Sequence, residues 1–161
     1  LDVDGNVTLG NQTSDATTVS GTLAVQSTTD STSKTTGAVV VSGGVGIGLD
    51  LRVGGDITAF SSSDQNLKQN LNVIPNAIDK VNAIAGYTFQ WKESTDVKFH
   101  PLYSRGGELD TGVIAQEIEA LGLPGITTVR DDGVKAVNYE KLVPLLIQAI
   151  KELDDKVNSL S

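Results

Sequence analysis

The sequence contains no cysteine, a single histidine and only four prolines among its 161 residues. Without cysteine the chain has no disulfide framework, no thiolate zinc site and no thiol nucleophile. Because His100 is the only histidine, a Ser-His-Asp triad has one possible base, and a metal site built from several histidines is excluded. We therefore expect neither a metal nor a cofactor.

Basic residues are scarce relative to acidic ones. Twelve lysines and arginines face twenty aspartates and glutamates, for a formal net charge of -8. A surface that binds nucleic acid needs an excess of lysine and arginine, so nucleic acid is excluded as a partner. Apolar runs are also short, and none approaches the roughly 20 residues of a membrane-spanning helix. Membrane insertion is therefore not expected.

Aromatic residues and prolines are nearly absent from the first part of the chain. Phe60 is the only aromatic residue in residues 1–60, and all four prolines follow Ser61. Residues 1–60 instead hold ten glycines and eleven threonines. This change in composition indicates two modules, residues 1–60 and 61–161.

The first module is repetitive. The pattern Leu-x-Val-x-Gly-polar-(Val/Ile)-Thr occurs at residues 1–8 and 51–58, and further short strands are predicted at residues 21–25 and 37–41. About 60 residues without a core of aromatics are too few to fold alone, so we expect the strands to be buried against other chains, as in three copies wrapped about one axis. A flexible Ser/Thr/Gly linker is the alternative; the apolar runs near residue 40 argue against it.

The second module mixes helices and strands. Its apolar periodicities predict two amphipathic helices, at residues 74–84 and 112–123, and a terminal helix at residues 139–160. They also predict one half-buried strand at residues 87–91 and one hairpin formed by residues 126–129 and 134–137. Pro144 should kink the terminal helix or mark where it begins. The fold class predicted for this module is therefore α+β.

The terminal helix carries apolar residues spaced four, three, four and three, at Leu146, Ile150, Leu153, Val157 and Leu160. This spacing is typical of a coiled-coil seam and predicts a coiled-coil part over residues 146–160. Packing of the same residues against the core of their own module is the alternative. Isoleucine and valine at a with leucine at d favour a dimer in isolation, so the seam by itself does not predict a trimer.

Ser63 and Lys68 are the candidate catalytic residues. A serine becomes a nucleophile only if a base removes its proton, and lysine is the other available base in a chain with one histidine. The lysine must be neutral, which requires desolvation to lower a pKa that is ordinarily about 10.4. On a regular helix, five residues separate the two side chains by about 140°, so the pair requires a turn or an extended entry. By spacing alone, a surface loop without chemistry is the alternative.

Other candidates are weaker. His100 is either a packed or loop histidine or an acid–base residue. Asp131 and Asp132 precede a glycine and are interpreted as a turn rather than a pair of catalytic carboxylates. Glu117 and Glu119 lie two apart on a predicted helix, so they face different ways and do not form a pair.

Four blocks of sequence together resemble a known family. They are Ser63-Asp64 followed by Leu67-Lys68-Gln69-Asn70; Gly86-Tyr87-Thr88-Phe89-Gln90-Trp91-Lys92; Gly112-Val113-Ile114-Ala115-Gln116-Glu117; and Val137-Asn138-Tyr139-Glu140-Lys141-Leu142-Val143-Pro144-Leu145-Leu146 with Ala149-Ile150-Lys151-Glu152-Leu153. In this order they resemble the self-cleaving intramolecular chaperone domain of phage tail fibres and tail spikes, the endosialidase type, a Ser-Lys autoprotease family. They cover nearly all of residues 61–161.

The resemblance implies a C-terminal module that brings three fibre chains into a homotrimer, helps the upstream shaft to fold, and then releases itself by autoproteolysis. It implies Ser63 as nucleophile, Lys68 as general base and a cut between Ser63 and Asp64. The chemistry alone does not decide which peptide bond is cut. Attack of Ser63 on the preceding carbonyl breaks the Ser62–Ser63 bond through an ester, whereas attack on its own carbonyl requires a four-membered ring, so an activated water or another chain would be involved.

The sequence departs from the family pattern in two places. Asn66 stands where the family usually has a basic residue before the Leu-Lys pair. Residues 94–110 belong to a stretch that looks variable, so the resemblance implies no role for His100.

The resemblance also implies an architecture, a location and a partner. The expected architecture is an α+β chaperone domain with a terminal coiled-coil helix, preceded by an all-β intertwined trimeric fibre shaft, either a triple β-helix or a β-prism. We expect assembly in the host cytoplasm, a place in the virion tail fibre, loss of the cleaved domain from the mature virion, and a host-surface receptor bound through the fibre. The start at Leu1 suggests a piece of a longer protein. The alternative function is a non-cleaving trimeric structural tip or adhesin that binds a host surface.

Overall fold

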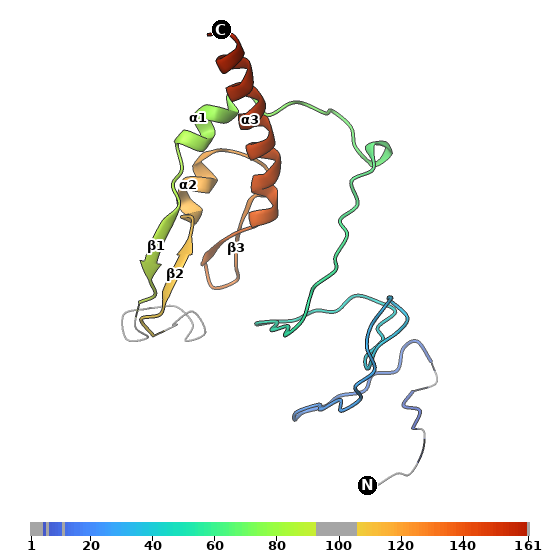
Figure 1. Ribbon diagram of the computed structural model, residues 1–161. Helices are drawn as coiled ribbons and strands as arrows, with labels where there is room; N and C mark the ends of the chain where they lie inside the picture. The colour runs from blue at the N-terminus through green and yellow to red at the C-terminus, as the bar shows by residue number, and fades with distance from the viewer. Residues whose placement is uncertain (1–4, 6, 11, 93–105, 161) are drawn as a thin grey trace. The chain divides into compact units, whose positions relative to one another are not determined.

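A computed structural model describes residues 5, 7–10, 12–92 and 106–160. The chain divides into two compact units, residues 1–61 and 62–161, both drawn in Figure 1. Most of the first predicted repeat, residues 1–8, and His100 lie outside the described residues. The interpretation of the two units as shaft and chaperone stays a prediction.

The first unit contains no helix or strand in the residues that the structure describes. The strands predicted at residues 21–25 and 37–41 are therefore not formed in the single chain. Its apolar side chains have no surface to cover them, since Leu23 is 72% exposed and Ile57 is 70% exposed. The hydrogen bonds among its described residues include local ones between hydroxyl groups and backbone, such as that from the Ser33 amide to Thr36 Oγ1 at 2.9 Å. A strand needs a paired neighbour and a buried face, and one copy of this segment provides neither.

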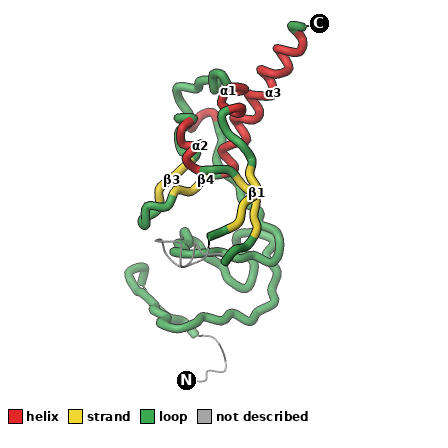
Figure 2. Tube along the Cα trace, turned by 90° about the vertical axis from the view of Figure 1, so that its left-hand side faces the viewer, coloured by secondary structure: helices red, strands yellow, loops and turns green. Residues whose placement is uncertain are grey.

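The second unit is α+β, as predicted. Its elements in chain order are η1 (Gln65–Leu67), α1 (Ala77–Asn82), β1 (Tyr87–Gln90), β2 (Leu109–Gly112), α2 (Ala115–Ala120), β3 (Thr127–Val129), β4 (Lys135–Val137), η4 (Tyr139–Lys141) and α3 (Leu142–Asn158). The two sheets are two-stranded and antiparallel, β1 with β2 and β3 with β4. Figure 2 shows α1 beside the long α3.

The β1–β2 pair corrects one prediction. The second helix was expected from residue 112, but Gly112 closes β2 opposite Tyr87 and α2 begins only at Ala115. The strand β2 itself was not predicted. Pairing with β1 overrides the apolar period at the start of this stretch, because a backbone ladder to a strand some 20 residues earlier is a tertiary contact that local pattern does not report.

The β3–β4 hairpin confirms the interpretation of its turn. The Arg130 amide donates to the Val134 carbonyl at 2.9 Å, and Gly133 has a φ of +84°. Asp132 accepts a hydrogen bond from the Val134 amide at Oδ1, 3.0 Å away. The adjacent aspartates therefore serve turn chemistry.

The small core forms where α1 packs against α3. Ala77 and Leu145 are fully buried and Ala149 nearly so, with Ile78 and Leu142 among the side chains packed around them. Ile118 of α2 and Ile126 before β3 are also buried. Pro144 lies in the first turn of α3, where its missing amide costs no hydrogen bond, so it marks the start of the helix as predicted.

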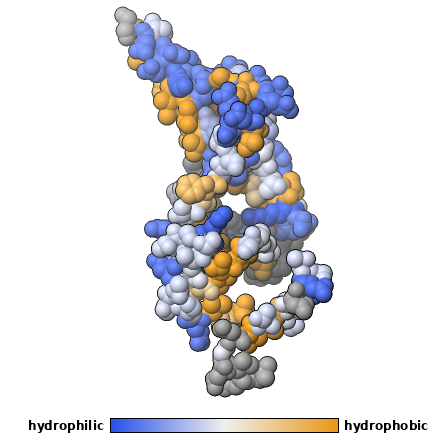
Figure 3. All heavy atoms as spheres, turned by 90° about the vertical axis from the view of Figure 1, so that its right-hand side faces the viewer, coloured by the Kyte–Doolittle hydropathy of each residue, from blue (hydrophilic) through white to orange (hydrophobic). Residues whose placement is uncertain are grey.

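The predicted coiled-coil seam faces away from this core. All five of its residues are exposed, from 45% for Leu146 to 88% for Leu160. Figure 3 shows apolar side chains along one side of the C-terminal helix and hydrophilic ones along another. The alternative in which the seam packs against its own module is therefore wrong for the single chain, because Leu145 and Ala149 are the residues of α3 that are buried against α1.

Candidate functional site

The structure brings Ser63 and Lys68 together. The Lys68 ammonium donates a hydrogen bond to Ser63 Oγ, with 2.6 Å between Nζ and Oγ. The two residues that sequence reasoning paired are thus in direct contact, although they are five positions apart.

The contact depends on the turn between the two residues. The segment η1 is a single 3-10 turn, closed by hydrogen bonds from the Leu67 amide to the Asp64 carbonyl at 3.1 Å and from the Lys68 amide to the Gln65 carbonyl at 3.0 Å. Asp64 is its N-cap and accepts a hydrogen bond from the Asn66 amide at Oδ1, 2.8 Å away. The turn that the five-residue spacing requires is present.

Both side chains of the pair are exposed in the single chain. In this arrangement Lys68 is the donor and Ser63 the acceptor. General-base chemistry needs the reverse, with a neutral amine accepting the hydroxyl proton. A second surface laid over the pair would favour the neutral amine, because desolvation disfavours the charged form. The single chain holds Lys68 Nζ and Ser63 Oγ in contact without supplying that cover.

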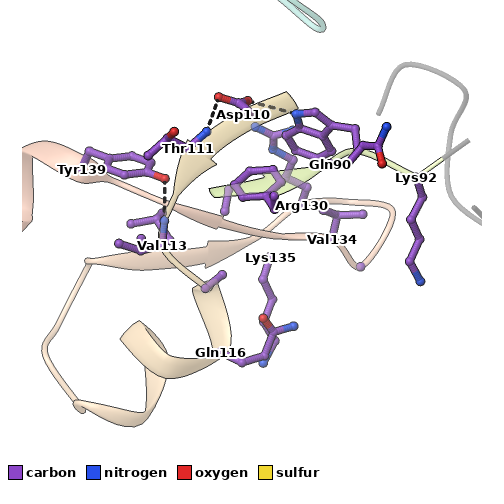
Figure 4. Close-up of a pocket in the computed structure, with 16 residues that line it drawn as sticks. Gln90, Lys92, Asp110, Thr111, Val113, Gln116, Arg130, Val134, Lys135 and Tyr139 are labelled. Atoms are coloured by element: carbon purple, nitrogen blue, oxygen red, sulfur yellow. Dashed lines mark hydrogen bonds between the residues drawn. The ribbon is translucent and has the colours of Figure 1, made fainter. Parts of the chain in front are cut away.

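An open pocket lies elsewhere on the second unit, lined by residues of both hairpins (Figure 4), with a volume of about 800 Å³. Phe89 and Trp91 meet edge to face in its wall, with 5.3 Å between ring centroids, and the Trp91 indole donates to Asp110 at 2.9 Å. Arg130 and Lys135 add positive charge. Sequence reasoning did not identify this pocket, because its walls come from strands far apart in the chain.

Tyr139 joins the block before α3 to the strand β2. Its hydroxyl accepts a hydrogen bond from the Val113 amide at 3.3 Å, as Figure 4 shows. A Cβ atom placed on Gly112 would lie 2.7 Å from the same hydroxyl oxygen. The glycine is therefore required by the close approach of the tyrosine.

Glu117 joins α2 to the strand β1. Its carboxylate accepts hydrogen bonds from the Tyr87 hydroxyl at 2.6 Å and from the Ala85 amide at 3.3 Å. The hydrogen bond to Glu117 raises the pKa of Tyr87, with smaller contributions from desolvation and from the carboxylate charge. Glu119 instead forms a salt bridge with Lys135. The two glutamates thus contact different partners and do not form a pair, which confirms the prediction that they face different ways.

Glu152 of α3 caps the beginning of α1. Its two carboxylate oxygens accept hydrogen bonds from the amides of Ala77 and Ile78, at 2.9 and 3.0 Å. These two backbone donors are the main cause of a pKa of Glu152 below its usual value. Sequence reasoning missed this role, because the partners are 75 residues apart and no local motif connects them.

Two further observations concern membrane-spanning helices and metal sites. Among the described residues, no helix is long and apolar enough to cross a membrane. In the same part of the chain, no three histidine or carboxylate side chains come together as a potential metal site.

Comparison with known proteins supports the resemblance seen in the sequence. Residues 63–127 match the Peptidase S74 family, described as chaperone of endosialidase. The long tail fiber protein Gp37 of Salmonella phage S16 is 32% identical over 102 residues, which are 62% of this chain and 13% of that protein. The protein of the same name from Escherichia phage AR1 is 32% identical over 95 residues, 58% of this chain and 8% of the relative.

The match begins at Ser63, so the Ser63–Lys68 pair lies at the start of the matched segment. The chain corresponds to only a small part of either relative's length. The blocks that carry the resemblance also contact one another, since Tyr87 meets Glu117 and Gly112 meets Tyr139. Residues 63–127 therefore belong to a domain of the Peptidase S74 family, the chaperone of endosialidase.

Proposed function

We propose that this chain is the C-terminal end of a phage tail fibre, in which residues 62–161 form a self-cleaving intramolecular chaperone. It assembles three copies, supports the folding of the upstream β shaft, and then separates from the shaft by cutting the chain at Ser63. The observation that carries the proposal is the 2.6 Å contact between Lys68 Nζ and Ser63 Oγ at the start of the matched family segment.

The proposed reaction is hydrolysis of the Ser63–Asp64 bond. A neutral Lys68 takes the hydroxyl proton of Ser63 and later returns a proton to the leaving amine of Asp64. Ser63 does not attack its own carbonyl, because the ring would have four members. Two routes avoid this ring. In one, Ser63 and Lys68 activate a water; in the other, Ser63 of one copy attacks the Ser63 carbonyl of a second copy, and water hydrolyses the resulting ester.

Exposed apolar side chains support assembly. They lie in the described part of the first unit and along the seam on α3. Three copies sharing these surfaces would form the shaft strands that are absent from the described part of one copy, and would supply the cover that Ser63 and Lys68 need to react.

The order of events follows from this dependence. Interchain β pairing is slow because contacts distant in sequence must form first, and a locally folded module that gathers the chains raises their effective concentration. If the pair reacts only when other chains cover it, cleavage waits for assembly. Removal of the module then makes the assembled shaft kinetically stable.

A denaturing gel of the full wild-type chain tests the function. Cleavage produces two fragments, residues 1–63 and 64–161, and mass spectrometry of the termini distinguishes a cut after Ser63 from one after Ser62. Ser63→Ala and Lys68→Ala abolish the splitting, and Ser62→Ala, its matched neighbour, does not. Lys68→Arg keeps the positive charge but remains protonated, so it also abolishes cleavage if Lys68 acts as a base.

A wild-type chain that forms trimers and stays intact refutes the autoprotease and leaves the alternative, a non-cleaving structural tip or adhesin. Co-expression of Ser63→Ala chains with wild-type chains separates the two routes. If Ser63 acts on a second copy, the variant chains are cleaved in mixed trimers; if Ser63 and Lys68 activate water in their own chain, the variant chains stay whole.

A further inference from the structure

The strongest further feature is the aspartate that follows Ser63. Asp64 has two independent contacts to the turn η1: its side chain accepts from the Asn66 amide at 2.8 Å and its carbonyl accepts from the Leu67 amide at 3.1 Å. We propose that Asp64 is a positioning residue, whose carboxylate holds the turn that places Lys68 against Ser63. This inference rests on the self-cleavage proposed above.

The pair cannot meet without this turn. Five residues in extended conformation span about 17 Å, a distance that a lysine and a serine side chain together do not bridge. A regular helix separates the two side chains by about 140°. The single 3-10 turn between two extended residues, Asp64 at φ −62°, ψ 133° and Lys68 at φ −123°, ψ 145°, avoids both problems.

The turn has little else to stabilise it. It is three residues long and none of them is buried, so hydrophobic packing does not hold it in the single chain. Its stability therefore comes from its two backbone hydrogen bonds and from the Asp64 cap. The carboxylate acts on the backbone of the turn, while the Lys68 ammonium contacts the reacting hydroxyl. Loss of the cap should thus reduce the fraction of chains in which the pair is formed.

Substitutions at Asp64 in the full chain test the proposal by the rate of cleavage. Asp64→Ala removes the acceptor and slows cleavage about fivefold, the factor expected for loss of a typical cap. Asp64→Asn and Asp64→Ser keep an acceptor for the Asn66 amide and cleave within about twofold of wild type. The shape of the pH profile is the same in all of them, because Lys68 remains the base.

Asp132→Ala is the matched control, because Asp132 makes the same contact to an amide two residues on, in the β3–β4 turn. It should leave the cleavage rate unchanged. The proposal is overturned if Asp64→Ala cleaves at the wild-type rate, or if Asp64→Asn is as slow as Asp64→Ala, since the carboxylate charge would then act directly on the chemistry.

A second measurement does not depend on cleavage. In the Ser63→Ala chain, the amide proton of Asn66 should resonate downfield because it donates to the Asp64 carboxylate, and in the Ser63→Ala/Asp64→Ala chain it should move upfield. An Asn66 shift that is the same in both chains refutes the positioning role whether or not the wild type cleaves. A wild-type chain that stays intact while Asp64→Ala does move the Asn66 shift refutes the proposed function and leaves the turn geometry standing.

Discussion

Truncation of Ile150 in the seam of α3 is the sharpest test of assembly. Full burial of an isoleucine side chain contributes about 1.5–3 kcal/mol. Ile150 is 66% exposed in the single chain, so burial in a trimer would gain about two-thirds of that value, ~1–2 kcal/mol per chain and ~3–6 kcal/mol for three copies. Ile150→Ala should lower the trimer association constant about 100- to 10,000-fold, since each 1.4 kcal/mol is tenfold.

Sedimentation equilibrium over a range of concentrations measures this constant. Alanine is a strong helix former, and Ile150 lies outside the α1–α3 core, so the helix content of the variant should match that of wild type. Lys151→Ala, one position off the seam and also exposed, is the matched control and should assemble like wild type. An Ile150→Ala trimer as tight as the wild-type one would refute a coiled-coil seam, and a wild-type chain that stays monomeric at every concentration would remove the trimer itself.

Two predictions concern stability. Because the pKa of Glu152 is lowered in the folded chain, its cap on α1 stabilises the fold at pH values above the usual pKa of 4.5, and this stabilisation is lost as the pH falls through the lower folded pKa. The thermal unfolding temperature of Glu152→Gln should therefore depend less on pH in that acid range than the wild-type value does. Equal acid dependence of the two proteins would contradict the cap. Gly112→Ala should destabilise the second unit by about 1–3 kcal/mol, the usual range for overpacking, because the new methyl group meets the Tyr139 hydroxyl. Gly86→Ala, which meets no atom within 4 Å, is its control in denaturant unfolding, and equal effects of the two substitutions would contradict the clash.

The sequence pattern predicted those elements of the second unit that depend on neighbouring residues along the chain. The period of apolar residues placed α1, and the Asp131-Asp132-Gly133 turn placed the β3–β4 hairpin. It failed at β2, whose strand conformation depends on pairing with β1. The same limit hid the pocket and the Glu152 cap, which join segments distant in the sequence.

For the candidate site, sequence supplied the residues and structure supplied the contact. A serine and a lysine five positions apart are common, and their spacing states only that a turn is needed if they are to meet. The structure contains that turn, with Asp64 as its cap. The catalytic roles of Ser63 and Lys68 stay a prediction for the cleavage assay.

The sequence by itself determined the change of character near residue 60, the exclusion of thiol and multi-histidine chemistry, the apolar seam and the family blocks, because each is a property of composition or short-range spacing. Only the tertiary structure decided which side of α3 meets α1 and which stays exposed, why Gly112 must lack a side chain, and where Glu117 and Glu152 find their donors. These depend on atoms that the chain brings together from far apart. The absence of strands in the described part of the first unit has the same origin, since the surface that would bury them is not in one copy of the chain.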